Sequence, residues 1–210
     1  AALIEHEDYL CMAFRGTDEI ADWIDNANVF PEQVLFGDFH RGFWYSLEDI
    51  WSGLFQCYLD LRVAKKRPRP LFITGHSLGG AMATVAAAKL IHQDRPFISA
   101  YTFGQPRTMS KETSYIFDIE AKARFFRFQN NNDLVTRVPA RLMGYNHVGS
   151  SIYISEEGSL YNDPGLWFRF LDSVEGAVDA VSQYKIDAID DHNMKHYIKA
   201  VGKWDFQTME

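Results

Sequence analysis

The sequence has few cysteines. Only two of its 210 residues, Cys11 and Cys57, are of this type, and they lie in the apolar stretches "YLCMAF" and "LFQCYLDL". We therefore expect both to be small buried hydrophobic residues. Two such residues do not form the disulfide framework of small secreted domains, which weakly favours a reducing compartment. The sequence also lacks Cys and His at metal-binding spacings, so neither a metal nor a cofactor is expected.

Basic residues are in the minority. The chain has 21 Lys and Arg against 28 Asp and Glu, and its net charge of −7 leaves no basic face for nucleic acid. The one basic run, "KKRPRP" at residues 65–70, is interpreted as a solvated connection, with a docking patch as the alternative. No apolar run approaches the roughly 20 residues that span a membrane, and no signal peptide is recognisable. A secreted and a cytoplasmic location both stay open.

The order of the predicted elements indicates an α/β fold. A chain of this length with 47% hydrophobic residues suits one domain, residues 1–210. Apolar runs bounded by turns predict strands, and apolar residues at helical spacing predict helices. We expect two strands within 1–16 and others at 71–74, 97–104, 123–130 and 150–155, with helices at 42–63, 81–93, 111–121, 167–181 and 193–201. Strands that alternate with helices imply a mostly parallel sheet with helices on both faces.

The run "LFITGHSLGGAMATVAAAKL" places a serine between glycines where a strand changes into a helix. "LFIT" has a buried-strand pattern, and "AMATVAAAKL" consists mostly of strong helix formers. A sharp turn at this point crowds Gly75 and Gly79, so residues without a Cβ fit best. Such a turn holds Ser77 in a strained conformation with Oγ exposed above the sheet. This context predicts the nucleophile elbow of an α/β-hydrolase rather than an ordinary Gly-rich loop.

A serine nucleophile needs a base and an acid that orients the base. In this fold the chain order is Ser, acid, His. Asp133 fits the acid, because it lies in the loop "NNDLVTRVP" directly after a predicted strand. Asp118 falls inside a predicted helix, and Asp172 follows the last clear strand. A plain turn residue is the alternative reading of Asp133.

Three histidines follow Asp133 and compete for the role of the base. His192 in "IDDHNMKHYI" lies on the loop after the last strand, where catalytic histidines of this fold occur. His196 is one turn further along the predicted helix, and His147 precedes the last strand, so both are less suitable. His76 is adjacent to Ser77, and neighbouring side chains in a tight elbow point apart, which excludes it as the base. His40 is interpreted as a satisfied structural histidine.

An oxyanion hole needs two hydrogen-bond donors. The backbone N–H of Leu78, the residue after the nucleophile, is expected to be one of them. The second donor should come from the loop after an earlier strand. "AFRGTD" fits, because Gly16 permits a close turn and Thr17 offers both an N–H and a hydroxyl.

The segment after Thr17 has the pattern of a short amphipathic helix. Ile20, Trp23 and Ile24 fall on one side of it, among charged neighbours. The alternative is that Trp23 is fixed core and holds the segment to the domain.

Seven motifs occur in an order and spacing typical of one family. They are "AFRGT", "DWIDN", "HRGF", "ITGHSLGGAMA", "TFGQPR", "NNNDLVTRVP" and "DHNMKHYI". Over residues 11–198 the chain resembles the class 3 lipases, which include filamentous-fungal triacylglycerol lipases and bacterial relatives. The resemblance implies a triad of Ser77, Asp133 and His192, with oxyanion donors at Thr17 and Leu78. It also implies a lid within residues 18–36 that opens at a lipid surface. Family members usually carry a further helical stretch before the first strand, which this chain lacks, and the secreted fungal members carry disulfides.

The expected activity is that of a serine carboxylester hydrolase. Its substrate would be an acylglycerol at an oil–water or membrane interface, and no metal, cofactor or nucleic acid would take part. Phospholipase A1 and feruloyl-type esterase activities are alternatives within the enzyme class. A non-enzymatic, lipase-like binding module is the alternative outside it. The oligomeric state is not indicated.

Overall fold

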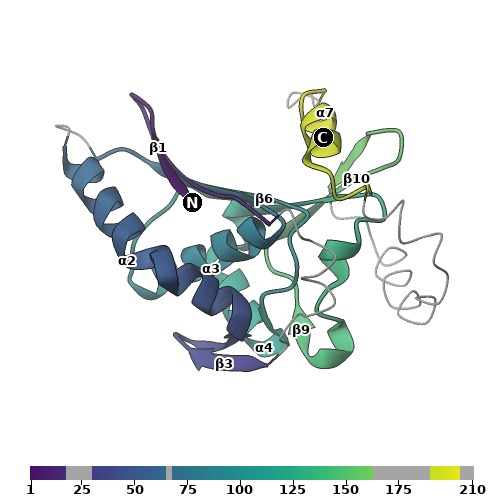
Figure 1. Cartoon of the computed structure of the whole chain (residues 1–210), viewed down its shortest axis with the longest axis horizontal. Helices are drawn as coiled ribbons and strands as arrows, with labels where there is room; N and C mark the ends of the chain where they lie inside the picture. Colours follow the sequence, from purple (N-terminus) through teal and green to yellow (C-terminus); the bar gives the residue numbers. More distant parts are fainter. Residues whose placement is uncertain (18–29, 65–67, 163–189, 204–210) are drawn as a thin grey trace.

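A mostly parallel central sheet of seven strands forms the centre of the molecule (Figure 1). The computed structural model describes residues 1–17, 30–64, 68–162 and 190–203. The strands lie in the order β1-β2-β5-β6-β8-β10-β11. Their bounds are β1 Ala2–Glu5, β2 Leu10–Phe14, β5 Leu71–His76, β6 Ser99–Phe103, β8 Phe125–Asn130, β10 Ser150–Ile154 and β11 Leu160–Asn162. The five strands from β2 to β10 pair in parallel, while β1 and β11 close the two edges as antiparallel neighbours.

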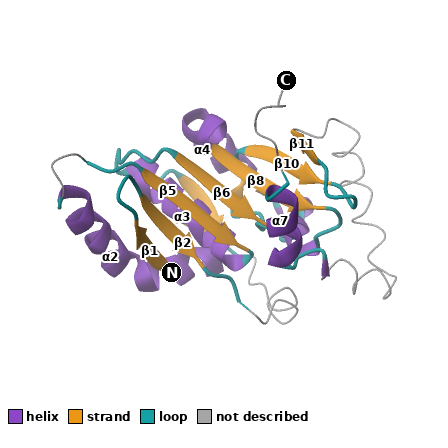
Figure 2. Ribbon diagram, turned by 90° about the horizontal axis from the view of Figure 1, so that it is seen from above, coloured by secondary structure: helices purple, strands orange, loops and turns teal. Residues whose placement is uncertain are grey.

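Helices cover both faces of this sheet, as predicted. Four α-helices are described: α2 Arg41–Val63, α3 Leu78–His92, α4 Lys111–Ala121 and α7 Met194–Val201. Figures 1 and 2 show α2 and α3 on one face, and α7 on the opposite face over β8 and β10. The α4 helix lies on the same face as α2 and α3, since its Phe117 packs edge-on against Phe125 of β8. The helix predicted at residues 167–181 lies outside the described residues.

Each face of the sheet has its own hydrophobic core. The larger core joins α2, α3 and α4 to β2, β5 and β6. All residues of α3 from Gly79 to Leu90 are buried, and the glycines and alanines among them allow the helix to lie close to the sheet and to α2. The smaller core holds α7 against β8 and β10, mainly through Phe128, Ile152 and Tyr197. The packing of α7 against β8 and β10 determines where the residues just before α7 lie.

A second, antiparallel sheet was not predicted from the sequence. Its strands, in the order β3-β4-β7-β9, are β3 Pro31–Val34, β4 Gly37–His40, β7 Met109–Ser110 and β9 Tyr145–Asn146. The turn between β3 and β4 carries Leu35 at a φ of 52°. Only the last residues of β4 are fully buried, so alternation of apolar and polar residues could not reveal this hairpin. Part of the expected lid region, residues 31–34, therefore belongs to a paired strand.

The predicted burial of the two cysteines is wrong for Cys57. This residue is exposed on α2, whereas Cys11 on β2 is partly buried. The buried stripe of α2 contains Trp51 and Tyr58, and Cys57 directly precedes Tyr58, one helical position off that stripe. Apolar neighbours in the sequence therefore did not imply a buried cysteine.

Candidate active site

Ser77 occupies a strained turn between β5 and α3. Its φ of 58° and ψ of −131° are rare for a residue with a side chain. A Cβ on Gly75 would lie 2.1 Å from the carbonyl oxygen of Gly79, and a Cβ on Gly79 would lie 2.1 Å from that of Phe14. Neither position accepts a side chain, so the predicted steric reason for both glycines is confirmed.

The side chain of Ser77 is buried, contrary to the expectation that Oγ is exposed. Only 1% of the residue is accessible to solvent. The segment after β2 covers it, because a Cβ on Gly16 would lie 2.9 Å from Ser77 Cβ and 3.5 Å from Oγ. The elbow geometry alone could not show this, since the covering residues are some 60 positions away in the sequence.

Asp133 lies just after the end of β8 and caps the 3₁₀ helix η2, Leu134–Arg137. It is completely buried, and Oδ1 accepts a hydrogen bond of 2.9 Å from the backbone N–H of Val135. The hydroxyl of Tyr197 on α7 donates to Oδ2 at 2.5 Å. A buried carboxylate requires such donors to remain ionised. Asp133 is therefore not a plain turn residue exposed to solvent.

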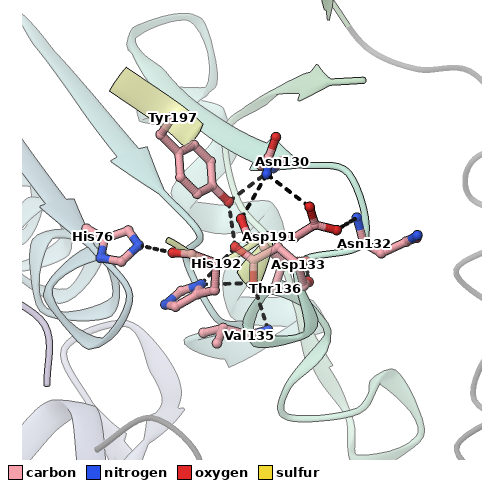
Figure 3. A network of polar contacts seen from close by, with 9 residues as sticks. All are labelled: His76, Asn130, Asn132, Asp133, Val135, Thr136, Asp191, His192 and Tyr197. Atoms are coloured by element: carbon pink, nitrogen blue, oxygen red, sulfur yellow. Dashed lines mark hydrogen bonds and ion pairs between the residues drawn. The ribbon is translucent and has the colours of Figure 1, made fainter. Parts of the chain in front are cut away.

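His192 lies two residues before α7, on the loop where it was predicted. Its Nδ1 is 2.8 Å from Oδ2 and 2.9 Å from Oδ1 of Asp133 (Figure 3). Because an ionised carboxylate can only accept, Nδ1 carries the hydrogen, and Nε2 of the neutral ring keeps a free lone pair. Neither Nε2 of His192 nor Oγ of Ser77 has a hydrogen-bond partner among the described residues, although both are buried. Two unsatisfied polar atoms of this kind are expected where a substrate binds.

The carboxyl ends of adjacent parallel strands bring these residues together. His76 at the end of β5 is the register partner of Phe103 at the end of β6, and Phe103 is that of Phe128 in β8. Gly104, next to Phe103, lies directly against the acid and the base. With a φ of +55°, it would place a Cβ 2.7 Å from both Asp133 Oδ2 and His192 Nδ1. The backbone N–H of Ser77 donates to the carbonyl of Phe103 at 3.0 Å, which ties the elbow to this edge.

Both expected oxyanion donors are adjacent in the chain to residues of the elbow region. Leu78 is the first residue of α3, where backbone N–H groups have no partner within the helix. Thr17 directly follows Gly16, the residue that packs against Ser77. Their role as oxyanion donors stays a prediction.

The other candidate side chains lie in different surroundings. Nε2 of His147 donates to the carbonyl of Thr136 at 2.8 Å, and burial together with nearby arginines holds the pKa of His147 well below its usual value. His196 is exposed beside Asp190, at 3.3 Å. Asp118, which lies in α4, accepts a hydrogen bond of 2.7 Å from the backbone N–H of Gly149. None of these contacts joins them to Asp133.

His40 is only partly satisfied as a structural residue. Its Nδ1 caps α2 by accepting from the backbone N–H of Phe43 at 3.4 Å, but Nε2 is buried without a partner among the described residues. Burial lowers the pKa of His40 to about 4. Asp172 and the lid residues Ile20, Trp23 and Ile24 lie outside the described residues.

Sequence reasoning missed the residues that hold the loop of the base. Asn131 Nδ2 and the backbone N–H of Asn132 donate to Oδ2 of Asp191, at 3.0 and 3.1 Å. Asn130 Nδ2 donates to the backbone carbonyl of Asp191 at 2.9 Å. The segment that carries the acid thus holds the residue before His192. The sequence shows two polar runs, "NNND" at 130–133 and "DDH" at 190–192, but nothing in it indicates that the asparagines bind Asp191.

The described part of the chain contains no group of three or more His, Cys, Asp or Glu side chains placed to hold a metal ion. It also contains no helix that is long and apolar enough to cross a membrane.

The model of the class 3 lipase family matches residues 11–143. The chain belongs to the class 3 lipase family. Its matched region contains the elbow and Asp133, whereas His192 lies beyond it.

Curated relatives and solved structures agree with this assignment. The secreted mono- and diacylglycerol lipase A of Penicillium cyclopium is 30% identical over 147 residues, which are 69% of this chain and 47% of the relative. Phospholipase A1-II 1 of Oryza sativa subsp. indica is 34% identical, over 71% of this chain and 44% of the relative. A solved triacylglycerol lipase, described as having a serine protease triad at its catalytic centre, superposes with a TM-score of 0.63 at 27% identity, over 70% of this chain and 57% of its own. The chain thus spans about half the length of the curated relatives that it matches.

Proposed function

We propose that this lipase-family protein is a serine carboxylester hydrolase that cleaves acylglycerols. The observation that carries the proposal is the pair of Asp133 and His192, whose geometry leaves Nε2 free at the same strand ends that carry the Ser77 elbow. A buried, oriented imidazole with a free lone pair is what a serine needs to become a nucleophile.

In the proposed mechanism, Ser77 Oγ attacks the ester carbonyl while Nε2 of His192 accepts its proton. The imidazolium then gives that proton to the leaving alkoxide, which departs as an alcohol and leaves an acyl-enzyme. Water attacks the acyl-enzyme by the same route and releases the fatty acid. Asp133 holds the Nδ1–H tautomer and stabilises the imidazolium without accepting its proton.

The tetrahedral intermediate formed in each half-reaction carries a negatively charged oxygen. The N–H of Leu78 and a donor of Thr17 are proposed to bind it. Loss of one such donor typically lowers kcat about 10²- to 10³-fold.

Acylglycerols are proposed as substrates because fungal relatives are named mono- and diacylglycerol lipases. Phospholipase A1 activity is the second candidate, and the rice relative of that name supports it. A lipid surface is the proposed site of action. The names of the fungal relatives also support secretion over a cytoplasmic location, which detection of the mature protein outside the producing cell would test.

The test compares the protein with its Ser77→Ala variant on p-nitrophenyl esters of increasing chain length, a triglyceride emulsion and phospholipid vesicles. Loss of at least about 10⁴-fold in kcat is expected for Ser77→Ala with an unchanged fold. A fluorophosphonate probe should label Ser77 alone. Activity that survives in Ser77→Ala, or the same low rate in both proteins, would exclude this function, and the latter result would favour a binding module.

His192→Ala and His196→Ala form a matched pair that tests the base. Both lie on the same short stretch, but only His192 contacts Asp133. We expect a loss of several orders of magnitude for His192→Ala and a change of less than about threefold for His196→Ala. The reverse ranking would refute the assignment of the base.

A further inference from the structure

His76, the residue before the nucleophile, contacts His192 in two ways. Its Nε2 lies 2.8 Å from the backbone carbonyl oxygen of His192 (Figure 3). The two imidazole rings also stack, with centroids 4.4 Å apart and an interplanar angle of 28°. The ring of Tyr197 also meets the His76 ring edge-on, with centroids 5.9 Å apart. His76 therefore lies against both the base and the tyrosine that supports the acid.

The hydrogen bond defines the protonation of His76. A carbonyl oxygen only accepts, so Nε2 of His76 must carry a hydrogen, and the neutral ring is the Nε2–H tautomer. Burial, followed by the nearby charge of His192, lowers the pKa of His76, while its hydrogen bond to the His192 carbonyl and the charge of Asp133 act in the opposite direction. His76 thus remains neutral beside a base that becomes cationic during turnover, and two adjacent imidazolium ions are avoided.

We propose that His76 is a positioning residue that fixes the main chain of His192 relative to Ser77. This inference rests on the proposed function. Asp133 holds only Nδ1 of the His192 ring, and Asn130, Asn131 and Asn132 hold only the preceding residue, Asp191. Among the described residues, the bond from His76 is the hydrogen bond that joins the main chain of the base to β5, the strand that directly precedes the nucleophile.

This placement matters because His76 and Ser77 are consecutive. A displacement of the elbow carries His76 with it, and the hydrogen bond draws the loop of His192 along. The separation between Oγ and Nε2 is thereby kept nearly constant although 114 residues lie between the two in the chain. A shift of about 1 Å between reacting groups can cost about 100-fold in rate, so one hydrogen bond at this point has a large effect.

Three substitutions separate the hydrogen bond from the ring. In His76→Gln the side-chain amide nitrogen reaches the position of Nε2, so the donor is retained without the ring. In His76→Asn the donor is one methylene too short, and in His76→Phe the ring is retained without a donor. The exposed His196→Gln serves as the matched histidine control, since it lies on the same stretch as His192.

Steady-state kinetics on a soluble short-chain ester are measured well below the lowest melting temperature of the series. We expect Asn and Phe to lower kcat about 10- to 100-fold with KM changed less than about twofold. Gln should stay within about fivefold of the unchanged protein, and the His196→Gln control should be unaltered. Equal losses in Gln, Asn and Phe, or no loss in any of them, would overturn the proposal.

A second measurement does not depend on turnover. ¹⁵N NMR of the histidine rings should show His76 as the Nε2–H tautomer, and the His192 resonances should move in Asn and Phe but not in Gln. Unmoved His192 resonances in all three variants would refute the positioning role even if the protein proved inactive on esters. An inactive unchanged protein with the expected NMR pattern would instead refute only the proposed function.

Discussion

The phenolic oxygen of Tyr197 lies 2.5 Å from Oδ2 of Asp133 and at the same time accepts a hydrogen bond of 3.0 Å from the backbone N–H of Asn130. The tyrosine thus links α7 to the end of β8 through the proposed acid itself. Burial and the charge of Asp133 raise the pKa of Tyr197 well above its ordinary value, so the hydroxyl is a donor at neutral pH.

Removing this hydroxyl in Tyr197→Phe should affect both stability and catalysis. The Asp133 carboxylate and the Asn130 N–H each lose a buried partner, which should cost about 1–3 kcal/mol in the free energy of unfolding. The carboxylate also loses the contact that fixes its orientation towards His192, so kcat should fall. Denaturant unfolding and steady-state kinetics measure both effects. Tyr161→Phe, on the exposed β11, is the control, and an unchanged kcat would show that Tyr197 only stabilises the fold.

Gly104→Ala should disrupt the site, because the new methyl group would collide with Asp133 and His192, at 2.7 Å from each. We expect kcat to fall at least tenfold and the unfolding free energy to fall by about 1–3 kcal/mol. Gly158→Ala has a similarly positive φ of +83° but nothing within 4 Å, so it isolates the backbone strain from the collision. Activity losses of the same size in both variants would argue against the collision.

His40 should make the fold sensitive to acid. Its pKa is about 4 in the folded protein, below the ordinary value of 6.5, so the unfolded chain binds an additional proton between these pH values. The contribution of neutral His40 to the free energy of unfolding is complete above pH 6.5. It decreases as the pH falls towards 4, by roughly 3 kcal/mol in total. His40→Asn retains a side-chain cap for Phe43 but does not titrate. Its unfolding free energy, measured in denaturant from pH 7 to pH 4, should therefore fall less steeply, and parallel curves would contradict this account.

Lys89 should stabilise the contact between α2 and α3. Its ammonium group lies 4.3 Å from the ring centroid of Trp44 and 5.6 Å from that of Trp51, and it pairs with Glu48. Lys89→Met retains the aliphatic stem and removes the charge, which should cost about 1–2 kcal/mol of unfolding free energy. Thermal unfolding measures the change, with the exposed Lys199→Met as control. An unchanged melting temperature would show that the cation contributes nothing beyond its stem.

Trp23→Ala tests the lid, which lies outside the described residues. If Trp23 covers a groove in water and faces lipid at an interface, its transfer could shift the open–closed balance by about 1–3 kcal/mol. Activity on emulsified triglyceride should then fall much more than activity on a soluble short-chain ester. Equal losses on both substrates, with a lower melting temperature, would identify Trp23 as core.

The sequence by itself determined the features that arise from local geometry. The clash between a Cβ on Gly75 and the carbonyl of Gly79 is an interaction within one turn, so the elbow at Ser77 could be recognised from five residues. Hydrophobic periodicity placed α2 almost to the residue. Chain order together with loop position also selected Asp133 and His192, which the structure brings into contact.

Only the tertiary structure decided what surrounds these residues. The contacts of His76 with His192, of Tyr197 with Asp133 and of Asn131 with Asp191 each join residues about 60 or more positions apart. These contacts depend on the order of the strands in the sheet and on the packing of α7 across β8. Neither the strand order nor this packing can be read from a short stretch of sequence. The same holds for Cys57, whose exposure follows from the rotation of α2 against the core rather than from its apolar neighbours.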